Sequence, residues 1–134
     1  MIENNKLIAE FMGLKVISKD EYLKHPQHET LNVNEYSIIE YQRYHKSWDW
    51  LMPVVEKIES LNLGDNTLKT IFSEEDVYLN SSVSFSIMYK ECYINFFGEM
   101  KVYENWISVT ECDSKIKAAY TAVVEFIKWY NENK

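Results

Sequence analysis

The most regular pattern along the chain is an apolar stripe close to its end. Between Ser114 and Asn131, apolar residues recur three or four positions apart, which is the spacing of one helix face. The stripe consists of Ile116, Ala119, Tyr120, Val123, Val124, Ile127 and Tyr130. Asp113 or Ser114 stands where a helix cap is expected. Phe126 and Trp129 widen the stripe, so we expect this helix to contact the sheet and also the first helix or a second subunit.

Two shorter helices are predicted nearer the start. The first covers Asn4–Met12 and ends at Gly13, a residue that readily adopts the left-handed conformation of a helix end. The second begins near Ser47, where Ser47 or Asp49 can accept hydrogen bonds from the first turn. Pro53 is expected close to that start, since proline is tolerated in a first turn. The apolar stripe of this helix is Val54, Val55, Ile58 and Leu61.

Two strand candidates lie between these helices. Leu14–Ile17 is a short apolar run, and Val33–Tyr44 contains the β-type run Glu35–Tyr41, so we expect the two to pair. The polar segment Ser18–Asn32 is interpreted as a loop or an insertion. Thr67–Asp76 is left open between a strand, a helical turn and an ordered loop.

Strict alternation marks the second half of the chain as a sheet with one buried face. One run places Val83, Phe85, Ile87 and Tyr89 on the same face, and the next repeats this with Cys92, Ile94 and Phe96. Lys90-Glu91 is the predicted turn between them, and Gly98 the end of the second strand. A third strand is expected from Lys101–Tyr103 and Trp106–Thr110, kinked at Glu104-Asn105. An antiparallel meander is the simplest connection of the three.

These elements predict an α+β fold, in which an antiparallel β-sheet packs with about three α-helices in helix–sheet layers, with a long C-terminal helix. The 134 residues fit one domain, 1–134. Hydrophobic residues make up 46% and charged residues 26%, and only three glycines and two prolines occur, which favours a globular chain over a linker. Aromatic residues reach 15%, either for packing or as stacking surface for a planar ligand.

The charge balance disfavours free nucleic acid as a partner. The net charge is −7, which repels phosphate at long range. Arg43 is the single arginine among fourteen basic residues, whereas phosphate and base readers favour the arginine fork. A small anion could still bind locally, through lysines or a helix N-terminus.

The cysteines, the histidines and the first residues indicate the cellular compartment and whether a metal is bound. Cys92 and Cys112 are twenty residues apart, which matches no zinc pattern, and two small buried thiols in a reducing compartment are favoured over a strand-to-strand pair. The first residues do not resemble a signal peptide, and no apolar run is long enough to span a bilayer. We therefore expect a cytoplasmic protein that does not associate with a membrane. His25 and His28, with Glu29 beside them, lack a third ligand, so we expect no metal.

The densest candidate site is the segment from Arg43 to Trp50. Arg43, His45, Trp48 and Trp50 could form an aromatic and cationic platform beside the free N–H groups of a helix start, suited to a small nucleotide-like ligand. The alternative interpretation, which we favour, is a tryptophan anchor that seats the helix on the sheet. We predict no catalytic residue and no cofactor, because no nucleophile signature surrounds either cysteine and no glycine-rich phosphate loop is present.

Three segments carry a family resemblance. Asn5–Gly13, Tyr44–Glu59 and Ser114–Glu132 together resemble small proteins of tailed bacteriophages and prophages, and the group is similar to the phage ABA-sandwich domain, named for its helix–sheet–helix layers. The three segments cover about a third of the chain. Between them the sequence departs from the group, and Ser18–Glu35 is unusually long.

The resemblance implies a bacteriophage setting, in the cytoplasm of the host cell, without an established activity. It leads to two hypotheses for a non-enzymatic accessory protein. In the first hypothesis we also expect the protein to form a homo-oligomer. The first is an anti-defence sponge that sequesters a nucleotide-derived immune signal through Arg43, His45, Trp48 and Trp50. The second is an inhibitor that docks on a host defence enzyme or a DNA-binding protein, where an acidic face could mimic nucleic acid.

Overall fold

The protein was analysed as a computed structural model, which describes residues 2–24, 36–61, 82–97 and 102–133. The elements follow the order α1 (Ile2–Phe11), β1 (Lys15–Ile17), α2 (Lys19–Lys24), β2 (Tyr36–Ile38), the 3₁₀ turn η2 (Ile39–Tyr41), α3 (Trp48–Glu59), β3 (Ser82–Met88), β4 (Glu91–Phe97), β5 (Val102–Val109) and α5 (Lys115–Asn133). The α+β class is therefore confirmed, with a long C-terminal helix on an antiparallel sheet.

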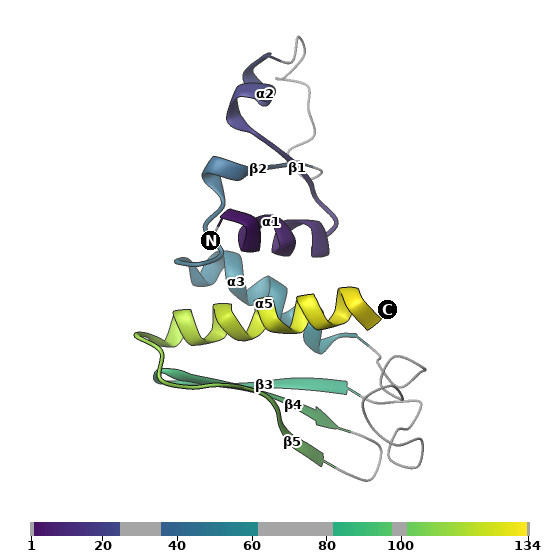
Figure 1. The fold of residues 1–134 in the computed structure, drawn as a ribbon, viewed down its shortest axis with the longest axis vertical. Helices are drawn as coiled ribbons and strands as arrows, with labels where there is room; N and C mark the ends of the chain where they lie inside the picture. Colours follow the sequence, from purple (N-terminus) through teal and green to yellow (C-terminus); the bar gives the residue numbers. More distant parts are fainter. Residues whose placement is uncertain (1, 25–35, 62–81, 98–101, 134) are drawn as a thin grey trace.

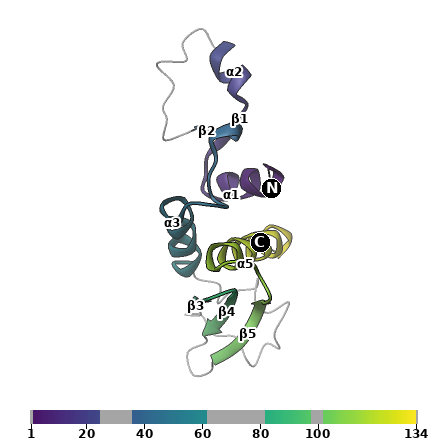
Figure 2. The same ribbon diagram turned by 90° about the vertical axis from the view of Figure 1, so that its left-hand side faces the viewer.

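The described elements form successive layers (Figure 1). The three-stranded sheet β3–β4–β5 lies at one end, α5 and α3 cover one of its faces, and α1 packs on the other side of α5. The two-stranded sheet β1–β2 and then α2 complete the opposite end. Figure 2 shows α3 and α5 side by side above the sheet. In the described residues the layers thus run sheet, helices, sheet, rather than the helix–sheet–helix order that the resemblance implies.

Helix α5 is the centre of the core, as its wide apolar stripe predicts. Phe126 and Ile127 are fully buried, as are Ala118, Ala119, Ala122 and Val123. One side of the helix contacts the sheet, and the other contacts α1 and α3, so the two expected neighbours are present. The rings of Phe11 and Tyr130 meet edge to face, with centroids 5.8 Å apart, which ties α1 to the end of α5.

The sheet has the predicted meander topology and register. Phe85 pairs with Ile94 and Ile87 with Cys92, so the apolar positions of β3 and β4 share the face that α5 covers. The turn contains Tyr89 and Lys90, one residue earlier than expected, and Lys90 adopts φ +66°. Between β4 and β5 the register shifts after Ile94, across the part of β5 where the kink is predicted.

Helix α1 ends as its sequence predicts. Gly13 has φ +83°. Its N–H donates to the carbonyl of Glu10, and the N–H of Leu14 donates to the carbonyl of Ala9, both at 3.0 Å. This pair of bonds satisfies carbonyls that the helix end would leave free. The chain then enters β1, which pairs with β2 in parallel, so the expected pairing is confirmed.

Two predictions between α1 and α3 are wrong. Residues 19–24 of the expected loop form helix α2, because the Ser18 hydroxyl accepts a bond from the Glu21 N–H at 3.0 Å and caps the first turn. The strand expected over Glu35–Tyr41 ends at Ile38, and Ile39–Tyr41 turns into a 3₁₀ helix. That turn lets the Glu40 carboxylate accept a bond from the Lys19 N–H at 2.8 Å, so it too caps α2.

Helix α3 begins after Ser47, as predicted, but two details differ. The Ser47 side chain makes no capping bond, although its backbone carbonyl accepts bonds from Trp50 and Leu51. Pro53 is the sixth helical residue and thus lies beyond the first turn. It is exposed, so the carbonyl of Asp49 that lacks its N–H partner can bind water.

Several predictions fall outside the described residues. They concern the segment with His25 and His28, the first residues of the Val33–Tyr44 run, Thr67–Asp76 and Gly98. Among the residues that are described, no helix is long and apolar enough to cross a membrane.

Candidate functional site: an aromatic cavity at the small sheet

A cavity of about 250 Å³ opens beside the two-stranded sheet. Four aromatic residues line it, from four different elements: Tyr22 of α2, Tyr36 of β2, Tyr41 of η2 and Trp50 of α3. Leu14, Ile38 and Ser37 complete its described wall. A mostly apolar, aromatic cavity with few polar groups is the usual form of a small-molecule site.

The two unexpected elements form part of this cavity. Helix α2 carries Tyr22 to the wall, and the 3₁₀ turn after β2 carries Tyr41 there. The Trp50 ring packs edge to face against the Tyr44 ring, with centroids 5.1 Å apart. Tyr44 itself is buried, and burial raises its pKa above the usual value, so it acts as a neutral packing ring.

One residue of the cavity wall, Ser37, belongs to a buried polar pair. The Gln42 amide donates a hydrogen bond to the Ser37 hydroxyl at 3.0 Å, and both residues are buried. The other amide atom of Gln42, the oxygen Oε1, is buried and has no partner among the described residues. A buried acceptor without a partner is costly and unusual.

The structure separates the four residues predicted from the sequence. Trp50 lines the aromatic cavity, whereas His45 lines a second hollow near the start of α5. Arg43 is exposed, and Trp48 is 36% exposed on the first turn of α3. The tryptophan-anchor interpretation thus describes Trp50 in part, since it is half-buried against Tyr44, but it does not describe Trp48.

His45 lies at the end of a chain of hydrogen bonds that begins at the buried Tyr120 hydroxyl. The Tyr120 hydroxyl donates to the Asn5 amide oxygen at 2.9 Å, and the Asn5 amide nitrogen lies 3.0 Å from Nδ1 of His45. An amide nitrogen only donates, so Nδ1 accepts and the ring proton is on Nε2. Desolvation, with the nearby charge of Lys46, holds the pKa of His45 below 6.5. His45 is therefore neutral near pH 7 and presents an N–H donor.

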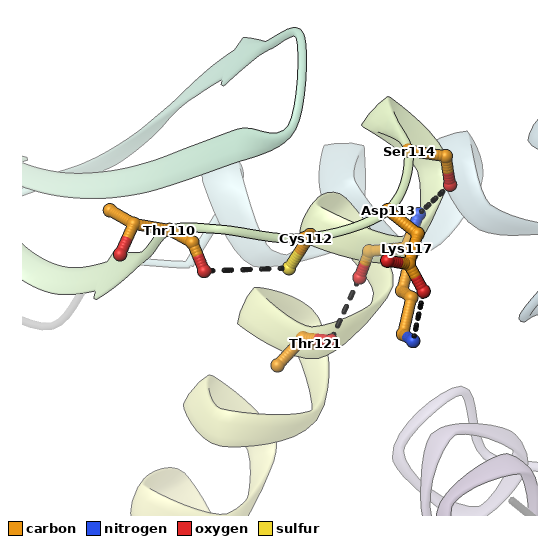
Figure 3. Close-up of polar contacts among 6 residues, drawn as sticks. All are labelled: Thr110, Cys112, Asp113, Ser114, Lys117 and Thr121. Atoms are coloured by element: carbon orange, nitrogen blue, oxygen red, sulfur yellow. Dashed lines mark hydrogen bonds and ion pairs between the residues drawn. The ribbon is translucent and has the colours of Figure 1, made fainter.

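The hollow beside His45 is open, and both polar and apolar side chains line it. Asn4, His45, Ser114, Lys117 and Tyr120 are among its lining residues. Figure 3 shows the start of α5, where the Ser114 hydroxyl accepts a bond from the Lys117 N–H at 3.2 Å. The Lys117 ammonium pairs with the Asp113 carboxylate at 3.0 Å on the surface of the helix start.

Nucleophilic and metal chemistry find little support in the described residues. Cys92 is buried, and burial raises the pKa of its thiol to about 12, which is opposite to the shift of a reactive cysteine. Cys112 lies after the end of β5, and both thiols are free. Within the described ranges, no three His, Cys, Asp or Glu side chains gather as a metal site would require.

Sequence reasoning missed most of the aromatic cavity. Tyr22 lay in a segment interpreted as a loop, and Ser37 and Tyr41 in a run interpreted as one continuous strand. The capping pattern Ser18-Lys19-Asp20-Glu21 could have revealed α2, because a serine followed three residues later by a glutamate marks a helix start. The Ser37–Gln42 bond had no comparable signal, since it depends on the turn between the two residues.

Comparison with known proteins gives no further guidance. No family model, no curated protein and no solved structure matches this chain.

Proposed function

We propose that this protein is a non-enzymatic binding protein that holds a planar ring in the aromatic cavity. The observation that supports this is the convergence of Tyr22, Tyr36, Tyr41 and Trp50 around about 250 Å³. Aromatic faces stack on planar rings at about 1–3 kcal/mol per ring, which is enough for a weak site to become a useful one when several rings contribute.

The size and charge of the cavity restrict the ligand. Drug-sized ligands usually occupy cavities of about 300–1,000 Å³, so this one suits a single ring system and leaves the remainder of a larger molecule outside. None of the described lining residues carries a charge, so this part of the wall offers a phosphate no charged partner. The base of a nucleotide fits these conditions better than its phosphate does.

The biological part of the proposal comes from the resemblance to phage proteins. It makes the protein a phage accessory protein in the host cytoplasm, one that sequesters a nucleotide-derived immune signal without cleaving it, and that forms a homo-oligomer. Light scattering on the purified protein would test the oligomeric state.

Calorimetric titration with cyclic nucleotides and ADP-ribose derivatives tests the binding function. We expect at least one of them to bind, with its affinity lowered about tenfold or more by Trp50→Ala. Trp48→Ala is the matched control, because Trp48 lies on the same helical turn but does not line the cavity. Absence of binding across the panel, or an equal loss in both variants, would contradict the proposal.

A second candidate function, an inhibitor that docks on a host protein, is favoured by the tip of the β3–β4 hairpin. Met88 and Tyr89 are 45% and 74% exposed there, next to Lys90. Tyrosine is enriched at the centres of protein interfaces. A stoichiometric protein partner that is captured by the natural chain and lost with Tyr89→Ser, but not with Trp50→Ala, would favour this function over ligand binding.

A further inference from the structure

The rings that line the aromatic cavity are of the two kinds that attract cations most strongly. Tyrosine and tryptophan have an electron-rich face, toward which a positive charge is drawn. The remaining residues of the described wall carry no charge. A cation in this space therefore meets several aromatic rings, and it meets no ammonium or guanidinium group of the described wall.

Two of the four rings already attract ammonium groups of the chain itself. The Lys15 ammonium lies over the Tyr36 ring, 5.7 Å from the ring centroid, and the Lys19 ammonium lies over the Tyr41 ring at 5.9 Å. Both distances are within the range of about 6 Å that is typical of a cation–π contact. Lys15 and Lys19 are exposed, so both contacts form where water competes with the ring. A cation enclosed among the rings should bind more strongly, because little water competes for it there.

We infer that the aromatic cavity selects a planar ring that carries a positive charge, namely an N-alkylated heteroaromatic cation such as a pyridinium or an N-methylated purine. The inference rests on the proposed ring-binding function and adds the charge of the ring to it. Stacking holds any planar ring, whereas the attraction between a ring face and a cation acts only on a charged one. The volume of about 250 Å³ suits one such ring, and a nucleotide with a cationic base would leave its sugar and phosphate outside.

The two lysines oppose a bound cation, so the sizes of the two effects decide the charge of the ligand. Each exposed ammonium lowers the affinity of a nearby cation about twofold, since water and salt screen the repulsion. One cation–π contact in an enclosed site raises the affinity about tenfold or more. The Glu40 carboxylate, which accepts a bond from the Lys19 N–H at 2.8 Å, offsets part of the positive charge beside Tyr41. The net charge of −7 also attracts cations at longer range.

Two pairs of ligands that differ in ring charge test the inference by calorimetry on the natural chain. The first pair is 1-methylnicotinamide, a cation, and neutral nicotinamide. The second is the oxidised form of nicotinamide mononucleotide, with a cationic ring, and its reduced form, with a neutral ring. We expect the cationic member of each pair to bind about tenfold more tightly.

The outcomes separate the inference from the proposed function. If the neutral members bind as tightly as the cationic ones, the inference about ring charge fails and ring binding stands. If no member of either pair binds, the inference is overturned. The proposed function then fails with it only when the cyclic nucleotides and ADP-ribose derivatives do not bind either.

Substitutions in the wall provide the second test. Trp50→Leu and Tyr36→Leu keep the wall apolar but remove a ring face, so each should reduce the preference for 1-methylnicotinamide over nicotinamide about threefold or more. Trp48→Leu is the matched control, because Trp48 lies on the same helical turn as Trp50 but does not line the described wall. An unchanged preference in both wall variants would overturn the inference, and the ligand pairs on the natural chain decide it even if a variant does not fold.

Removing a lysine tests the sign of the electrostatic effect. Lys19→Gln takes away a positive charge over the Tyr41 ring, so it should raise the affinity for 1-methylnicotinamide about twofold at low salt. The affinity for nicotinamide should stay unchanged, which makes the neutral ligand the control for packing. A lower affinity for the cation in Lys19→Gln would contradict a cationic ligand.

Discussion

The Glu59 carboxylate at the end of α3 accepts a hydrogen bond from the backbone N–H of Phe85 at 3.0 Å. Phe85 belongs to β3, which is an edge strand of the three-stranded sheet as far as the described residues show. An edge strand has backbone groups that no neighbouring strand satisfies, and a second chain can pair with them. Glu59 satisfies one of these groups and places a negative charge along the edge.

Replacing Glu59 is therefore expected to have two effects. Glu59→Ala removes a charged acceptor from a partly buried N–H, so the free energy of unfolding should fall by about 1–3 kcal/mol in a urea titration. It also leaves the edge of β3 open, so concentration-dependent self-association should appear in size-exclusion chromatography. The matched control is Glu56→Ala, one turn earlier on the same helix, where the side chain is exposed. An equal effect of both substitutions would show that the edge contact is unimportant.

The start of α5 allows a capping bond to be compared with a surface ion pair. The Ser114 hydroxyl bonds to the Lys117 N–H, whereas the Asp113–Lys117 pair lies on the surface, with side chains 87% and 58% exposed (Figure 3). Ser114→Ala should lower the free energy of unfolding by about 1 kcal/mol. Asp113→Asn should have a smaller effect than Ser114→Ala, since exposed ion pairs are screened by water. Thermal unfolding at low and high salt would check this order, and a larger loss for Asp113→Asn would refute it.

The two thiols should differ sharply in reactivity. Burial raises the pKa of Cys92 to about 12, so almost none of it is thiolate at neutral pH. Cys112 is half-buried and follows β5, where reagents can reach it more easily. Iodoacetamide treatment followed by peptide mass spectrometry should show modification of Cys112 in the folded chain, and of Cys92 only after denaturant is added. Modification of Cys92 at the same rate as Cys112 would contradict the burial argument.

The sequence predicts the long elements, in which the apolar pattern repeats several times, and leaves the short elements undetermined. The stripe of α5 and the alternation of β3 and β4 each repeat over many residues, so single exceptions do not obscure them. Residues 36–41 are too few for a period to decide between strand and 3₁₀ helix. There the contacts decide, because turning after Ile38 places Glu40 on the start of α2.

The candidate site was harder to predict than the fold for the same reason. Arg43, His45, Trp48 and Trp50 are close in sequence, but successive positions of a turn and a helix point in different directions. Trp50 therefore reaches the aromatic cavity, while His45 faces the start of α5. The cavity's other aromatic residues come from segments whose local structure the pattern did not reveal. A site that four elements assemble is specified by tertiary packing, which a linear pattern does not contain.

The chain from Tyr120 through Asn5 to His45 predicts a pH dependence with a definite sign. His45 has its pKa lowered below 6.5 in the folded state, first by desolvation, so the unfolded chain binds its proton more readily. The contribution of His45 to stability is therefore present above about pH 6.5 and is lost as the pH falls through the folded pKa. The free energy of unfolding, measured by urea titration between about pH 7.5 and 5.5, should fall more steeply for the natural chain than for His45→Gln.

Replacing Asn5 by aspartate should reverse the direction in which His45 makes stability depend on pH. In the natural chain the Asn5 amide donates to Nδ1 of His45 and so opposes protonation of that atom. Asn5→Asp puts a carboxylate there, which accepts a bond from a protonated Nδ1 and from the Tyr120 hydroxyl. The pKa of His45 should then rise above 6.5, and its contribution to stability should be lost as the pH rises through the new value. An NMR titration of the His45 ring, assigned with His45→Gln, measures both pKa values; a lower pKa in Asn5→Asp would show that the contact does not control the protonation of His45.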